Sequence, residues 1–125
     1  MSAGSAATVA GMDRFELAEL LETHARDGRA YHEFLRVPAL SAGVYVLPAG
    51  GEDPQQPHAE DEIYHVLRGR GRFRAGAADV PVGPGDTLFV AAEAEHRFHA
   101  IEEDLVLLVV FGPAQTRRSE PATPG

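Results

Sequence analysis

Two stretches of the sequence decide the fold: residues 56–69 read QPHAEDEIYHVLRG, and residues 85–98 read GDTLFVAAEAEHRF. In an extended strand, side chains two residues apart point to the same face of the sheet. Three pairs of polar or aromatic residues have this spacing: Gln56 and His58, Glu62 and Tyr64, and His96 and Phe98. We therefore expect imidazole, carboxylate and aromatic side chains to gather on one face of a sheet.

Short apolar segments separated by Gly and Pro surround these two stretches, which is the pattern of an all-β fold. The segments predict strands at residues 31–37, 42–47, 62–68, 72–75, 79–82, 86–90, 97–101 and 105–111. Gly69-Arg70-Gly71 and Gly83-Pro84-Gly85 are expected to form turns. Such a series favours a small antiparallel barrel or double-sheet jelly roll, which can hold one small ligand inside.

One helix is predicted ahead of the strands, over residues 13–27. Asp13 is a suitable N-cap, and Phe15, Leu17, Leu20 and Leu21 form an apolar stripe of helical period. We expect a single domain over residues 13–113, with the barrel at 30–112. Residues 1–12 are expected to be a disordered segment, and residues 114–125 a flexible tail.

The composition excludes several classes of function. The chain has 125 residues, a formal net charge of −8 and no cysteine. An acidic chain without a basic block does not favour nucleic acid, and thiolate metal sites and disulfides need cysteine. No apolar run is long enough to span a bilayer, and the first residues lack a secretory pattern. We therefore expect a cytoplasmic protein that binds neither nucleic acid nor membrane.

His58, Glu62 and His96 form a candidate metal site. Two imidazoles and one carboxylate are a common ligand set for divalent metals with open positions, and Gln56 offers a neutral oxygen as a fourth donor. The alternative is that the histidines are surface or hydrogen-bonded residues and that residues 58–62 form a solvated acidic loop. For Glu60 the pattern favours a solvated turn over a contact with the ligands. By the same strand parity, His65 and His99 should face outward.

These residues resemble the two motifs of the cupin superfamily, G-x5-H-x-H-x3-4-E-x6-G and G-x5-P-x4-H-x3-N. The resemblance covers about residues 40–112. Gly50, His58, Glu62 and Gly69 fit the first motif, and Gly85 and His96 fit the second. Three positions depart from the motifs: Gln56 replaces a histidine, Ala91 the proline and Ala100 the asparagine.

The resemblance implies a small single-domain barrel of the cupin type-2 kind that holds one divalent metal, Fe, Mn, Ni or Zn. It also implies an enzyme that acts on a small oxygenated molecule, of the dioxygenase or isomerase type, with Tyr64 and Phe98 lining the pocket. Two alternatives stay open: a binding module without turnover, which the loss of a histidine at Gln56 favours, and a mainly structural dimer with a vestigial pocket.

We predict a homodimer, because two-fold dimers are the commonest soluble oligomers and the first strands offer an unpaired edge. Sedimentation at micromolar protein should give about twice the 13.4 kDa chain mass. A mass of one chain would contradict the prediction.

We also predict that Gln56→His tightens metal binding, because imidazole is a stronger donor than an amide oxygen for Fe, Ni and Zn. Calorimetric titration of the variant and the original chain with one metal measures the change. Equal affinities would show that Gln56 is not a metal neighbour.

Overall fold

A computed structural model of the chain describes residues 7–9, 11–54 and 57–116. Gln56, the fourth predicted donor, lies outside the described residues. The predicted all-β class with one N-terminal helix is confirmed. The elements are β1 (Ala7–Val9), β2 (Met12–Arg14), α1 (Leu17–Asp27), β3 (Tyr31–Val37), β4 (Leu40–Leu47), β5 (Asp61–Ala75), β6 (Ala78–Val82), β7 (Thr87–Val90) and β8 (His96–Gly112).

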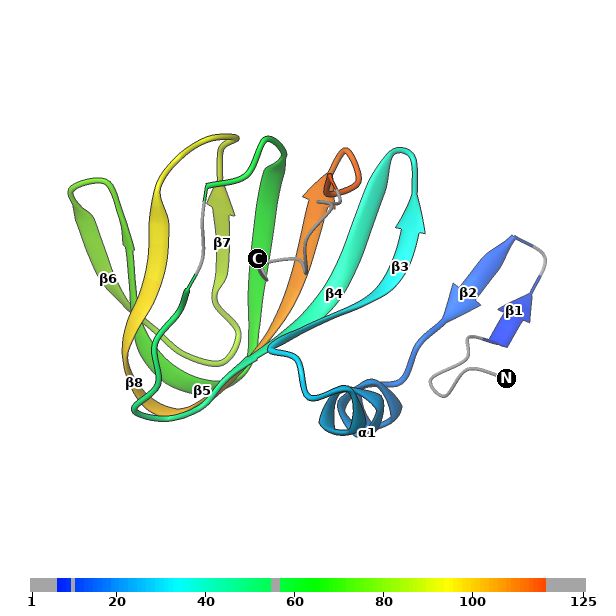
Figure 1. Cartoon of the computed structure of the whole chain (residues 1–125), viewed down its shortest axis with the longest axis horizontal. Helices are drawn as coiled ribbons and strands as arrows, with labels where there is room; N and C mark the ends of the chain where they lie inside the picture. Colours follow the sequence, from blue (N-terminus) through cyan, green and yellow to red (C-terminus); the bar gives the residue numbers. More distant parts are fainter. Residues whose placement is uncertain (1–6, 10, 55–56, 117–125) are drawn as a thin grey trace.

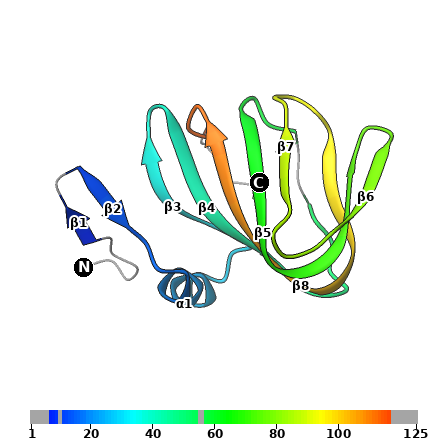
Figure 2. The ribbon, with the colours of Figure 1, turned by 180° about the vertical axis from the view of Figure 1, so that it is seen from behind.

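One antiparallel sheet folds back on itself to make both walls of the barrel (Figure 1). Its strand order is β3-β4-β8-β5-β6, and β7 pairs with β5. Residues 61–66 of β5 pair with residues 107–112 of β8 and with β7. Residues 70–75 of β5 pair instead with residues 96–103 of β8 and with β6. The two long strands therefore run from one wall into the other, as the view from behind also shows (Figure 2).

The bend of β5 replaces a turn that the sequence predicts. Gly69-Arg70-Gly71 was expected to separate two strands, but it lies inside β5, where the register with β8 shifts repeatedly. Gly69 has a φ of +92°, and a Cβ there would lie 2.1 Å from the backbone oxygen of Asp104. Bulges of this kind bend a strand without ending it. In the same way, the strands predicted at 97–101 and 105–111 are one continuous β8.

The two faces of the folded sheet have separate apolar clusters. The inner face of β5 buries Glu62, Tyr64 and Val66, whereas Ile63 between them is 42% exposed, so the predicted alternation is correct. The inner cluster also includes Phe73 and Phe98. On the outer face, Leu20 of α1 packs with Val44 and Val106. No helix among the described residues is long and apolar enough to cross a membrane.

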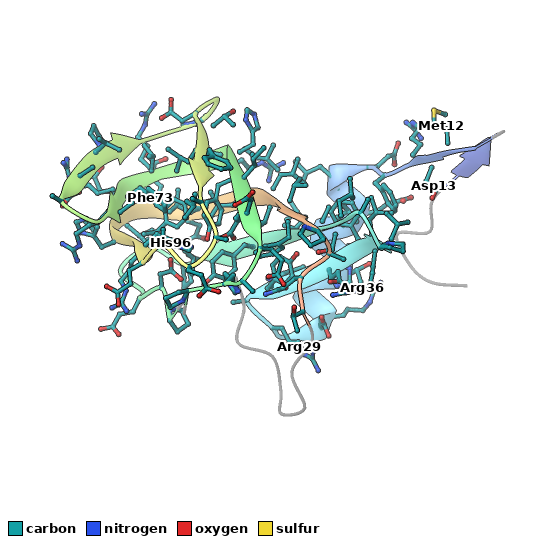
Figure 3. The ribbon with its side chains drawn as sticks, turned by 90° about the horizontal axis from the view of Figure 1, so that it is seen from above. Met12, Asp13, Arg29, Arg36, Phe73 and His96 are labelled. Atoms are coloured by element: carbon teal, nitrogen blue, oxygen red, sulfur yellow. The ribbon has the colours of Figure 1, made fainter. Side chains whose placement is uncertain are left out.

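The N-terminal boundaries differ from the prediction. The helix begins at Leu17 rather than Asp13, because Asp13 belongs to β2 and pairs with Thr8 of β1. The described part of residues 1–12 forms a short hairpin rather than a disordered segment. Figures 1 and 2 show the hairpin extending away from the barrel, and Figure 3 shows Met12 and Asp13 on it.

The tail predicted from Ala114 onward begins as an ordered segment. Its described residues, 114–116, donate backbone hydrogen bonds to Pro38, Ser41 and Glu60. The backbone groups are thus paired with the barrel, which is the reason that the chain stays against it.

Asp53 fixes the long connection between β4 and β5, the segment that carries His58. Its carboxylate is 1% exposed and accepts hydrogen bonds from the Tyr45 hydroxyl (2.5 Å) and from the backbone N–H of Phe98 (2.9 Å). A buried charge is tolerated when its oxygens are hydrogen-bonded. This connection is therefore attached to β4 and β8 from inside the barrel.

We predict that Tyr45→Phe lowers the free energy of unfolding by about 1–3 kcal/mol, the cost of removing one partner of a buried polar group. Tyr31→Phe is the matched control, because the buried Tyr31 hydroxyl has no hydrogen-bond partner among the described residues. The control should not lower the free energy of unfolding, because it removes a buried hydroxyl that has no hydrogen bond to lose. Equilibrium urea denaturation measures both values, and equal losses would refute the role given to Asp53.

Candidate functional site

Glu62 of β5 and His96 of β8 meet deep inside the barrel. Their side chains are 1% and 2% exposed, and Nε2 of His96 lies 3.1 Å from Oε1 of Glu62. The two atoms are not aligned for a hydrogen bond, and both Glu62 oxygens are without such a partner among the described residues. The contact is therefore electrostatic, and the carboxylate retains unused acceptor positions.

The surroundings of His96 direct the lone pair of its Nε2 into the barrel. Nδ1 lies 2.8 Å from the carbonyl oxygen of Ala94, which can only accept, so Nδ1 carries the proton. In the neutral ring, Nε2 is then the acceptor, and the Tyr64 hydroxyl donates to it over 3.1 Å. A backbone carbonyl at one ring nitrogen is the usual arrangement behind a histidine that binds metal through the other.

The pKa of His96 lies above its ordinary value. Burial lowers this pKa, but the neighbouring Glu62 carboxylate and the Ala94 carbonyl together raise it by more. A proton added to Nε2 would face Glu62. The pair therefore holds either a proton or another cation more readily than a lone buried imidazole does.

His58 approaches the same interior from the connection before β5. It is 5% exposed, its ring packs edge-on against Phe111 with centroids 5.0 Å apart, and its carbonyl accepts a hydrogen bond from the N–H of Glu93. Nε2 of His58 is buried without a hydrogen-bond partner in the described part of the chain. Nδ1 lies 3.3 Å from the side-chain nitrogen of Gln115.

The donor chemistry of these residues fits a divalent metal, although they are not gathered around one point. Nε2 of His58 and the two oxygens of Glu62, which have no hydrogen-bond partner among the described residues, are atoms of the kind that such ions bind. The rings of His58 and His96 are 6.3 Å apart between centroids. Within the described ranges, no three His, Asp or Glu side chains are close enough to hold an ion.

Tyr31 adds a hydroxyl to this interior. Its ring lies over Gly43 on the neighbouring strand, where any Cβ would come within 2.3 Å of the ring. Burial, together with the charges of Glu33 and Glu62, raises the pKa of Tyr31 far above its usual value. The phenol thus stays neutral and can donate a hydrogen bond inside the barrel.

The two predicted pocket residues are buried at the base of the site. The ring of Phe98 stands edge-on to Tyr64 with centroids 4.9 Å apart, and both residues have 0% exposure. Burial, followed by the charge of Glu62, raises the pKa of Tyr64. Figure 3 shows His96 beside Phe73 in the barrel, with ring centroids 5.9 Å apart. Tyr64 contacts His96 directly, with ring centroids 5.8 Å apart, and Phe98 packs against Tyr64 and Phe73 behind it.

His65 and His99, which follow Tyr64 and Phe98 in the chain, lie on the outside of the barrel. His65 contacts the Thr87 hydroxyl over 2.7 Å, and His99 contacts Asp79 over 3.0 Å. Both contacts are at the surface, and Arg72 also binds Asp79. The predicted outward orientation is confirmed for both residues.

Three residues of the site were not found from the sequence, and one was misjudged. Asp53, Tyr31 and Gln115 belong to no motif, and no local spacing marks them, because only the folded chain brings the β4–β5 connection, the first residue of β3 and the segment after β8 to the interior. Glu60 was expected in a solvated turn, but it is 4% exposed and accepts two hydrogen bonds from Thr116. Its burial depends on a segment 56 residues away in the chain.

Similar proteins share this architecture. The Cupin domain model matches residues 43–111, which include His58, Glu62 and His96. The uncharacterized protein SCO3923 of Streptomyces coelicolor is 43% identical over 105 residues, which are 84% of this chain and 100% of that protein.

Two solved structures align at a TM-score of 0.61 and 22% identity. One is a cupin 2 conserved barrel domain protein from Rhodopseudomonas palustris, with 75% of this chain and 70% of that chain aligned. The other is KdgF from Halomonas sp., with 72% and 80% aligned. At this identity the likeness concerns the fold. Because the matched Cupin domain spans residues 43–111, most of the barrel, the chain belongs to the cupin family.

Proposed function

We propose that this cupin binds a divalent metal and a small oxygenated organic molecule inside the barrel, with His58, Glu62 and His96 as the metal ligands. The observation that carries the proposal is a set of buried atoms, Nε2 of His58 and both oxygens of Glu62, that have no hydrogen-bond partner among the described residues. Unpaired buried polar atoms are costly, so a site that retains several of them on facing elements is suited to a ligand. Gln56 is a further donor that the motif spacing supports.

A bound metal supplies Lewis acidity toward a carbonyl or hydroxyl oxygen. The residues of this chain then have separate tasks. Glu62 and His96 offer a lone pair each from opposite long strands, and Ala94 holds His96 in the required tautomer. Binding requires the three side chains to come closer together than they are in this structure, where the ring centroids of His58 and His96 are 6.3 Å apart.

The Tyr31 hydroxyl is the group that would contact the organic molecule. It is a neutral donor without a hydrogen-bond partner among the described residues. A donor inside a barrel that also holds the Glu62 carboxylate suits a molecule with hydroxyl, carbonyl or carboxyl oxygens. This preference agrees with an isomerase or dioxygenase type of reaction, in which the reacting atoms of such a molecule contact the metal.

A second candidate function is a binding module without turnover. The wide spacing of the two imidazole rings favours it, because a catalytic metal needs its ligands held in a fixed geometry. In this case the unpaired atoms of His58, Glu62 and Tyr31 would bind the small molecule directly. Metal titration separates the two functions.

We predict that His96→Ala and Glu62→Gln each weaken metal binding by more than about 100-fold, beyond what the loss of an outer partner of a ligand causes. Isothermal titration with Zn²⁺ and Ni²⁺, together with elemental analysis of protein purified without chelator, measures the change. Far-UV circular dichroism should show the same β structure in each variant.

His65→Ala is the matched control for this test, because its ring lies on the outer face of the same β5 strand. It should bind metal like the original chain. Equal losses in His65→Ala and His96→Ala would refute the ligand assignment. If the original chain binds neither Zn²⁺ nor Ni²⁺, the metal site is refuted, and the second candidate function, a binding module without turnover, is favoured.

A further inference from the structure

The C-terminal strap, residues 113–116, crosses back over the barrel after β8 and reaches the site. Backbone N–H groups of Ala114 and Gln115 donate to the Pro38 carbonyl (3.3 Å) and the Ser41 hydroxyl (2.9 Å). The guanidinium of Arg36 donates to the carbonyl of Gln115. Arg36 belongs to β3 and is labelled in Figure 3. The backbone at position 115 is thus held from both sides.

Glu60 provides the second anchor of the strap. One carboxylate oxygen of Glu60 accepts from both the N–H of Thr116 (2.9 Å) and its hydroxyl (2.6 Å). Hydrogen bonds to a charged acceptor are among the strong ones. Since Glu60 lies two residues after His58, this anchor ties the strap to the segment that positions the imidazole.

The held backbone places the side-chain amide of Gln115 3.3 Å from Nδ1 of His58. The amide can present either its nitrogen or its oxygen there, because a half-turn exchanges two atoms of similar size. If the nitrogen faces the ring, Nδ1 accepts, and Nε2 must carry the proton as a buried donor. That proton would have no acceptor among the described residues, since Nε2 has no hydrogen-bond partner there.

If the amide oxygen faces the ring, neither ring nitrogen is left with an N–H group that lacks an acceptor. Nδ1 then carries the proton and donates it to Gln115, and Nε2 keeps its lone pair inside the barrel. A lone pair without a partner is a smaller penalty than an unpaired N–H in the same place. The result is the arrangement that Ala94 creates for His96, made here by a side chain from a different segment.

We infer that Gln115 is a positioning residue that accepts the Nδ1 proton of His58, fixes that tautomer and so leaves Nε2 ready to bind the metal. This inference rests on the proposed function for its consequence, but the tautomer itself is a property of the metal-free protein. The strap holds the Gln115 side chain next to Nδ1 of His58, and the amide oxygen favours the tautomer that is protonated at Nδ1.

The tautomer of His58 tests the inference without any metal. Long-range ¹H–¹⁵N correlation spectra at about pH 8, where an ordinary imidazole is neutral, distinguish a protonated from an unprotonated ring nitrogen, and His58→Ala assigns the signals. We expect protonated Nδ1 and unprotonated Nε2 in the original chain. Gln115→Met, which has a similar length and no acceptor oxygen, should lose this preference, and Gln115→Glu should retain it.

Metal titration provides the second readout. Gln115→Met should weaken Zn²⁺ and Ni²⁺ binding about 10–100-fold, the usual effect of losing the partner behind a histidine ligand. Gln115→Glu should bind at least as tightly as the original chain, because a carboxylate is a stronger acceptor. Thermal denaturation of each variant shows whether the fold is kept.

The outcomes separate this inference from the proposed function. A protonated Nε2 in the original chain, or unchanged tautomer and affinity in Gln115→Met, would overturn the role of Gln115. If the original chain binds neither metal, the metal site is refuted, and the spectra alone decide whether Gln115 selects the tautomer. Should Gln115→Met not fold, the spectra of the original chain and of Gln115→Glu decide the question.

Discussion

The fold depends on the close approach of two backbones where β5 and β8 bend together. Gly69 lies so near Asp104 that no side chain fits between them, and the register of the ladder shifts on both sides of it. Because both strands bend at the same level, one ladder supplies two facing walls. Each wall contributes one member of the site: Glu62 comes from the first half of β5, and His96 from the first half of β8.

This construction brings charged groups into a largely apolar interior, where each must be stabilised. Asp53 is hydrogen-bonded by Tyr45 and Phe98, and Glu60 by Thr116. Glu62 alone of the three has no aligned donor in the described part of the chain. The difference is informative, because the structural carboxylates are satisfied by the protein and the one beside His96 is not.

Strand alternation was sufficient to predict much of the site from the sequence. The spacing of Glu62 and Tyr64 placed both side chains inward, and the odd offsets of His65 and His99 placed those rings outward. The same local rules could not predict the bend at Gly69, because a glycine cluster fits a turn and a bulge equally well. They also gave the wrong start for α1, since the pairing of Asp13 with Thr8 is a contact between strands. Local rules could not predict the role of Gln115 either, because its partner His58 lies 57 residues earlier in the chain.

The contact between Tyr31 and Gly43 has a consequence for the shape of the interior. The ring occupies the space that a side chain at position 43 would need, so the two positions share one volume. A larger residue at 43 would displace the ring, and with it a buried hydroxyl that has no hydrogen-bond partner among the described residues. Among related chains, the exchange of a large and a small residue between these positions would keep the barrel filled while changing the chemistry of its wall. A single glycine on β4 thus decides whether the barrel presents a hydrogen-bond donor to whatever it encloses.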